Sequence, residues 1–374
     1  MHLVTDAPVN LRSILYVPAR RERGILHLRT DYGLKLYSRK VLIQEHNKDL
    51  LPNYFRFVEG VVDSEDLPLN ISRETVQSNP MLRHMQRALT NRLVKELGAL
   101  AQDRAEDYRT FWREFGAFIK EGIAADPASH SALQDVLRFP SSKADDAHDL
   151  VSLKEYVSRM KADQKAIYYV LGQDLKSVVH SPHLDYFRAN DLEVLYLVDP
   201  LDSFMAMSLR EYAGKPLQNV DDAGLDLPQA SPSAQVEAGE ALPQADFDRL
   251  VQRFQTLLGD QVAEVRQSQH LTESPCRLVT PAGSPDRDLQ RVRRLIEQEY
   301  QMPKKILELN RHHPLIQHLA RLLAERPDEA LINVAIQQLF DNALLLEGLH
   351  PNPADMTPRI QTLMQAAIAA RSTA

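Results

Sequence analysis

The sequence predicts a multi-domain protein of mixed α/β and α+β class, with two α/β units followed by an α+β domain. Three observations lead to this prediction. Short runs of β-forming residues alternate with amphipathic helical patterns along most of the 374 residues. An acidic, proline-containing stretch at residues 226–243 interrupts this alternation and predicts a linker. Beyond the linker, the pattern ends in two strongly apolar helices.

The first α/β unit is expected at residues 1–100, within a middle domain that spans residues 1–225. Residues 11–18 (LRSILYVP) and 34–43 (LKLYSRKVLI) are rich in β-formers and predict two strands separated by a polar loop. A shorter strand is expected within residues 56–63. A helix of about six turns is predicted at residues 79–100, because apolar side chains there repeat at spacings of three and four residues.

A helical connector is predicted at residues 101–145, with a helix at 108–122 and a shorter one at 130–139. The first of these places Trp112, Phe115 and Ile119 on one face, a spacing that favours core packing over ligand binding.

The second α/β unit is expected at residues 146–225. The runs AIYYVL (166–171) and EVLYLV (193–198) are typical of strands buried on both faces. Helical patterns around residues 174–190 and 202–212 alternate with them, which predicts a parallel sheet. Neither strand is followed by the glycine-rich pattern of a dinucleotide site, so that alternative is set aside.

Residues 244–374 are predicted to form a dimerisation domain. It should contain a helix at 246–258, strands near 262–268, 277–280 and 306–309, a helix at 286–300 and three further helices. The last two helices, at residues 330–346 and from Thr357 onwards, are too apolar to be covered by one small domain. We expect a helical hairpin that pairs with its copy around a two-fold axis, and the alternative is a hairpin folded back on its own sheet. The expected interface residues are Ile332, Ile336, Leu339, Phe340, Ala343, Leu346, Ile360, Leu363, Met364 and Ala367.

Composition excludes several classes of function. A net charge of −7 gives no electrostatic footprint for nucleic acid. The single cysteine, Cys276, excludes an intrachain disulfide and indicates a reducing compartment. No apolar run approaches a membrane span and no signal peptide is evident, so a cytoplasmic protein is expected. The pairs His180/His183 and His312/His313 lack a carboxylate at zinc-site spacing, so we expect capping or surface histidines and no metal site.

Residues 61–77 (VVDSEDLPLNISRETVQ) resemble the signature of heat-shock protein 90 middle domains. Six further segments match the same family in the same order: residues 34–41, 51–60, 151–161, 166–172, 271–279 and 306–316. The chain is therefore similar to the middle and carboxy-terminal parts of the bacterial heat-shock protein 90 chaperones of the HtpG type.

The resemblance implies a phosphate-sensing loop. The family's arginine falls on Arg73 and its glutamine on Gln77, and both would contact the terminal phosphate of ATP held by an amino-terminal domain. A planar guanidinium stabilises charge on a phosphoryl group during transfer, and Asn70 would help to shape the loop. ATP and Mg²⁺ are the cofactors of the complete family protein. This chain matches no part of the ATP-binding domain, so alone it is expected to bind neither and to be inactive as an ATPase.

Client binding is the other implied activity. Leu289, Val292 and Ile296 lie on one face of the predicted helix at 286–300 and are the candidates, and ordinary core packing of these residues is the alternative. The leading hypothesis is a chaperone fragment that binds unfolded or partly folded clients, forms a homodimer and supplies its arginine loop to an ATP-binding domain. The alternative is a non-catalytic regulatory protein that dimerises with a full-length chaperone. An unrelated α/β enzyme is a third hypothesis, against which the absence of nucleophile and cofactor motifs argues.

Overall fold

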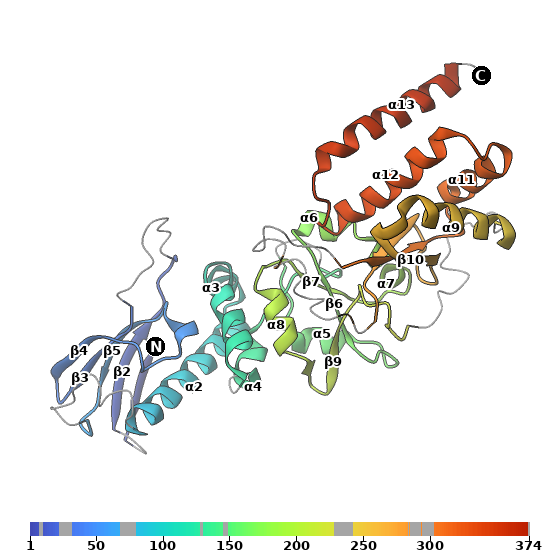
Figure 1. Cartoon of the computed structure of the whole chain (residues 1–374). Helices are drawn as coiled ribbons and strands as arrows, with labels where there is room; N and C mark the ends of the chain where they lie inside the picture. Colours follow the sequence, from blue (N-terminus) through green and yellow to red (C-terminus); the bar gives the residue numbers. More distant parts are fainter. Residues whose placement is uncertain are drawn as a thin grey trace. The chain divides into compact units, whose positions relative to one another are not determined.

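The computed structural model describes residues 1–6, 10–21, 32–67, 80–127, 130–144, 149–227, 242–282, 284, 293 and 303–372. They form helices and three β-sheets (Figure 1), which confirms the mixed α/β fold class. The chain divides into two compact units. Unit 1 comprises Met1–Arg138, Leu150–Glu155 and Phe204–Tyr212, and unit 2 comprises Phe139–Asp149, Tyr156–Ser203 and Ala213–Ala374. The domain boundaries expected from the sequence stay a prediction.

Unit 1 contains a five-stranded sheet with the order β1-β2-β5-β3-β4. The strands are β1 (His2–Thr5), β2 (Leu11–Tyr16), β3 (Leu34–Ser38), β4 (Val41–Asn47) and β5 (Glu59–Asp63). Neighbouring strands are antiparallel except β3 and β5, which are parallel. Residues of β2 alternate strictly between buried and exposed, as in a sheet with one covered face.

The prediction of a single strand at residues 34–43 is wrong. This segment forms the antiparallel hairpin of β3 and β4, with Arg39 and Lys40 in the turn at φ values of 48° and 67°. A two-residue hairpin turn commonly requires positive φ, and asparagine or glycine is its usual sequence signal. Arginine and lysine give no such signal, so the sequence alone predicts a continuous strand here.

Two long helices pack against each other in unit 1, α2 (Pro80–Asp103) and α3 (Ala105–Ala125). Trp112, Phe115 and Ile119 of α3 are buried, which confirms their prediction as core residues. The ring of Phe57 stacks on Phe115 with centroids 4.6 Å apart. The predicted helix at 130–139 is shorter, since α4 (His130–Leu133) passes into a 3₁₀ turn, η3 (Gln134–Val136), and the backbone is extended at Leu137.

Unit 2 begins with a parallel arrangement of β7 (Leu195–Leu197), β6 (Ile167–Leu171) and β9 (Lys215–Asn219), with β6 between the other two. The prediction of a parallel sheet is therefore confirmed. The helix expected around residues 174–190 is broken into α6 (Leu175–Val178), η4 (Pro182–Leu184) and α7 (Asp185–Ala189). Pro182 starts the new turn because it has no N–H for a continuing helix, and Ser181 caps that turn.

The second sheet of unit 2 has the order β10-β12-β11, formed by β10 (Val262–Gln267), β12 (Lys305–Leu309) and β11 (Cys276–Val279). It shares one hydrophobic core with α9 (Gln244–Leu258), α11 (Pro314–Glu325) and α12 (Ala330–Leu346). α13 (Thr357–Ser372) then lies alongside α12 near the carboxy terminus (Figure 1). The remaining elements are η1 (Asn53–Phe55), α5 (Leu153–Arg159), α8 (Asp202–Ser208), β8 (Glu211–Tyr212), η6 (Gly259–Gln261) and η8 (Pro353–Met356).

Within these described ranges, no helix combines the length and the apolarity that crossing a membrane requires.

Candidate functional site

Two groups of predicted site residues lie outside the part of the chain that the structure describes. The first is the predicted phosphate-sensing set, Arg73, Gln77 and Asn70. The second is the predicted client-binding set, Leu289, Val292 and Ile296. Both sets stay predictions, and the described geometry concerns the third set, on the hairpin of α12 and α13.

The α12 residues of that third set belong largely to the core of their own chain. Their burial in the hydrophobic core of unit 2 accounts for much of the apolar character of α12 without a partner, and the residues concerned are Ile332, Ile336, Leu339, Phe340 and Ala343. Any contact they make with a second copy stays a prediction.

α13 differs, because its apolar side chains face solvent in the monomer. Ile360, Met364 and Ile368 repeat every four residues and are 40%, 58% and 65% exposed. Residues four apart lie on the same side of a helix, so these three form one stripe, which we call the α13 stripe. Leu345 and Leu346, at the end of α12, are also exposed.

The hairpin itself is fixed by an ion pair between its two helices. The Arg359 guanidinium of α13 donates to the carboxylate of Asp341, which is buried on α12. His350, in the loop between the helices, places its Nε2 atom 3.7 Å from the same carboxylate. α13 is thereby held to α12 by polar contacts near its start, while the α13 stripe stays exposed.

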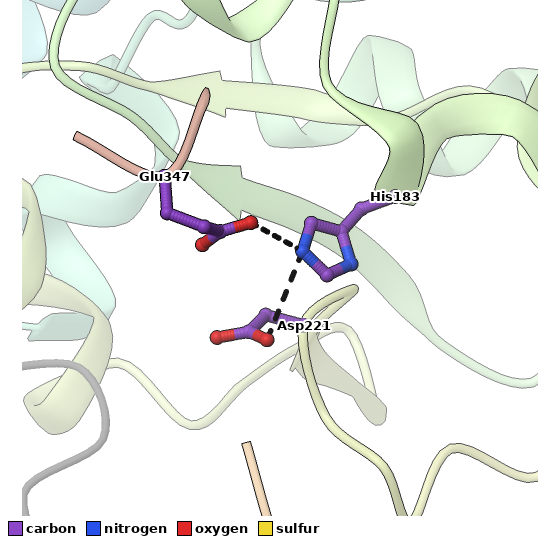
Figure 2. Close-up of side chains that lie close together, drawn as sticks. All are labelled: His183, Asp221 and Glu347. Carbon is purple, nitrogen blue, oxygen red and sulfur yellow. Dashed lines mark hydrogen bonds and ion pairs between the residues drawn. The ribbon is translucent and has the colours of Figure 1, made fainter. Parts of the chain in front are cut away.

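A second polar group of unit 2 was not predicted from the sequence. It consists of His183 from η4, Asp221 after β9, Lys305 at the start of β12 and Glu347 at the end of α12, and we call it the buried ion cluster. Figure 2 shows the imidazole of His183 beside the carboxylates of Glu347 and Asp221. The His183 Nε2–H donates to Glu347 Oε1 at 2.6 Å, and Asp221 Oδ1 lies 3.8 Å from the same nitrogen.

Lys305 completes this cluster. Its Nζ atom donates to Asp221 Oδ2 at 2.9 Å and lies 3.6 Å from Glu347 Oε2. Thr280 adds two hydrogen bonds to Asp221, from Oγ1 at 2.7 Å and from the backbone N–H at 3.1 Å. Side chains from five segments far apart in the sequence therefore share one network.

The opposite charges within the cluster keep its members ionised although they are buried. Burial raises the pKa of Glu347, but the Lys305 ammonium and His183 outweigh this effect and lower the pKa to about 2. Burial likewise lowers the pKa of Lys305, whereas Asp221 and Glu347 raise it by more, so its pKa is shifted upward. Both groups are therefore charged at neutral pH.

The same cluster contains the side chains that a metal ion would need. His183, Asp221 and Glu347 each offer one ligand atom, and these atoms lie within 4.8 Å of one another. However, the Lys305 ammonium already forms ion pairs with both carboxylates. A divalent cation would have to displace this buried lysine, so these residues fit an ion cluster better than a metal centre.

The histidines also show where the sequence interpretation failed. His313 caps α11 by accepting a hydrogen bond from the N–H of Leu315, which confirms its prediction as a capping residue. His183 is 1% exposed, so its prediction as a capping or surface residue is wrong. One local signal was available for the cluster, because Glu347 ends a helix where the dipole disfavours an acid unless a cation lies nearby.

Comparisons with known proteins match one protein family along nearly the whole chain. A family model described as "Hsp90 protein" matches residues 1–374. The chaperone protein HtpG of Nitratidesulfovibrio vulgaris is 38% identical over 369 residues, which cover 98% of this chain and 58% of that protein. The HtpG proteins of Chlorobaculum tepidum and Desulfitobacterium hafniense are each 36% identical, over 98% of this chain and 58% and 59% of their own lengths. The chain thus spans somewhat more than half the length of these relatives.

Proposed function

Because the chain belongs to the Hsp90 family, we propose that it acts as part of an HtpG-like chaperone in the cytoplasm, as a homodimer that binds unfolded or partly folded proteins. The relatives that it resembles are named chaperone proteins. The observation that best supports a dimer is the exposed α13 stripe beside Leu345 and Leu346. Apolar surface that repeats along one helical face is typical of a helix that pairs with another.

The dimer would form when two α12–α13 hairpins meet around a two-fold axis. α12 contributes its exposed end, and its other apolar residues keep their place in the core of each chain. Leu363 and Ala367 of α13 lie next to the stripe on the helical surface and would lie at the edge of the contact.

ATP hydrolysis would require a complete family protein, in which an amino-terminal domain binds ATP and Mg²⁺. Arg73, supported by Gln77 and Asn70, would then stabilise the charge on the terminal phosphate from the middle domain. This role is carried by the resemblance of residues 61–77 to the family signature.

Light scattering tests the dimer. The parent chain should have the mass of a dimer at micromolar concentration, and Met364→Glu should weaken the dimer about 100-fold, because it places a charge in the middle of a buried apolar contact. Gln365→Glu is the matched control, since it adds the same charge to the next exposed position of α13, away from the stripe. Its dimer should persist.

The same samples test client binding. The parent chain should suppress the aggregation of a chemically denatured model protein at stoichiometric ratios. A monomeric parent chain would contradict the proposed dimer, and a chain without any effect on aggregation would contradict the proposed client binding.

A further inference from the structure

Residues on either side of the predicted linker (226–243) belong to the same compact unit. The structure places the α/β segment (residues 156–203 and 213–227) and the carboxy-terminal segment (residues 242–372) in one compact unit. Several buried polar contacts join them. Asp185 of α7 accepts hydrogen bonds from the N–H groups of Glu273 and Ser274, at 3.1 and 2.7 Å, and from Ser274 Oγ at 3.2 Å.

A second junction lies between the loop after β9 and the end of β11. The Thr280 N–H donates to the backbone oxygen of Asp221, and the Ala223 N–H donates to that of Thr280. These bonds align the two backbones in parallel, with a bridge between Asp222 and Thr280. These backbone hydrogen bonds therefore fix the position of Asp221 in the junction, and its side chain belongs to the buried ion cluster.

The buried ion cluster is the third junction, and it reaches the α12–α13 hairpin. His183 and Asp221 come from the α/β segment, whereas Lys305 and Glu347 come from the carboxy-terminal segment. Glu347 is the last residue before Gly348, whose φ of +66° ends α12 and turns the chain towards α13. The carboxylate of Glu347 is thus bonded to the α/β segment at the point where the hairpin leaves α12.

The chemistry of the cluster makes this attachment sensitive to the loss of one member. Lys305 and His183 have side chains that are 4% and 2% exposed, and those of Asp221 and Glu347 are 14% and 13% exposed, so water has little access with which to replace a missing partner. Breaking a buried ion pair by removing one partner is far more disruptive than breaking an exposed pair. Loss of the Lys305 ammonium would leave two carboxylates facing each other and would drive Glu347 out of the cluster.

We propose that the buried ion cluster positions the α12–α13 hairpin on the α/β segment of unit 2, so that Lys305 and Glu347 control the orientation of α13. One consequence of this inference rests on the proposed dimer. If α13 binds the partner chain, a change within the α/β segment reaches this helix through Glu347. Lys305, Glu347 and Asp221 are positioning residues, because none belongs to the α13 stripe itself.

Amide hydrogen exchange by mass spectrometry on the full chain tests this proposal through Lys305→Met. Exchange within residues 348–357 should accelerate at least about 10-fold, and dimer dissociation measured by light scattering should shift in the same direction by a similar factor. Lys304→Met is the matched control. Lys304 is the neighbouring residue and its partner Asp260 is fully exposed, so the same substitution there should change neither quantity.

The double variant with Lys305→Met and Glu347→Gln removes one positive and one negative charge together. It should recover much of the protection at residues 348–357, because the amide of Gln keeps a hydrogen bond to His183 and Asp221, still hydrogen-bonded by Thr280, becomes the one carboxylate of the cluster. It also serves as the test if Lys305→Met alone does not fold.

Three results would overturn the proposal: unchanged exchange in Lys305→Met, a uniform increase throughout unit 2, or no recovery in the double variant. If the parent chain is monomeric, the proposed dimer fails, but the exchange at residues 348–357 still decides whether the cluster positions the hairpin.

Discussion

Acid should remove a defined part of the stability of unit 2 through Glu347. The pKa of Glu347 is lowered from 4.5 to about 2 in the folded chain, mainly because Lys305 and His183 offset its burial. A group with a depressed pKa stabilises the folded state above its unfolded pKa, and this contribution is lost as the pH falls towards the folded pKa. The shift corresponds to about 3 kcal/mol, of which about 2 kcal/mol should be lost between pH 6 and pH 3.

The comparison that isolates this group is the parent chain against Glu347→Gln, which cannot titrate at this position. Cys276 reports the unfolding of unit 2, because it is the only cysteine and is buried in β11, where burial raises its pKa to about 12. A pyridyl disulfide, which reacts with thiols in acid as well as at neutral pH, traps the unfolded form during a urea titration.

From about pH 6 to pH 3, the parent chain should lose about 2 kcal/mol more than Glu347→Gln. Lys305 does not contribute to this difference, because its pKa is shifted upward and its stabilising effect is lost only in strongly alkaline solution. Equal losses in both proteins would refute the assignment of a depressed pKa to Glu347 and, with it, the close pairing with Lys305.

Two further predictions concern unit 1. The first uses the chain joined to the ATP-binding domain of a longer relative. There, Arg73→Ala should reduce ATP turnover about 100-fold with little change in nucleotide affinity, whereas Gln77→Ala should have a smaller effect because glutamine carries no charge. Turnover of Arg73→Ala at the parent rate would show that Arg73 has no part in the mechanism. Arg39→Asn combined with Lys40→Gly should stabilise unit 1 by about 1 kcal/mol, because the turn already has positive φ at both positions. Trp112 fluorescence in urea measures this gain, and a loss of stability would show that the turn geometry is different.

Much of the fold could be predicted because its signals are local. The apolar run at residues 166–171 predicted a strand covered on both faces, and β6 is buried over its first four residues. The three- and four-residue spacings of Leu82, Met85, Leu89 and Leu93 predicted α2, whose buried face contains these side chains. The hairpin at Arg39 and Lys40 could not be predicted, because its conformation is imposed by the pairing of β3 with β4 rather than by the turn residues.

The buried ion cluster shows what sequence patterns miss. Lys305 precedes the apolar run of β12 and would be read as the polar end of a strand, yet its side chain is 4% exposed. His183 follows Pro182 in what reads as a surface helix. Only the folded chain brings these residues together with Asp221 and Glu347, since each comes from a separate element and no two share a local spacing.

The two terminal helices show a related limit with a direct consequence for the proposed dimer. Composition alone makes α12 and α13 look equally in need of a partner, but the sheet of unit 2 covers α12 and leaves the α13 stripe exposed. The energy of association must then come mainly from α13 and from the end of α12. In a two-fold interface each residue occurs twice, so in the proposed dimer a charge at Met364 would be buried in two copies. Desolvating two carboxylates on an apolar stripe costs several kcal/mol, which is why a single substitution at Met364 should suffice to separate the two chains.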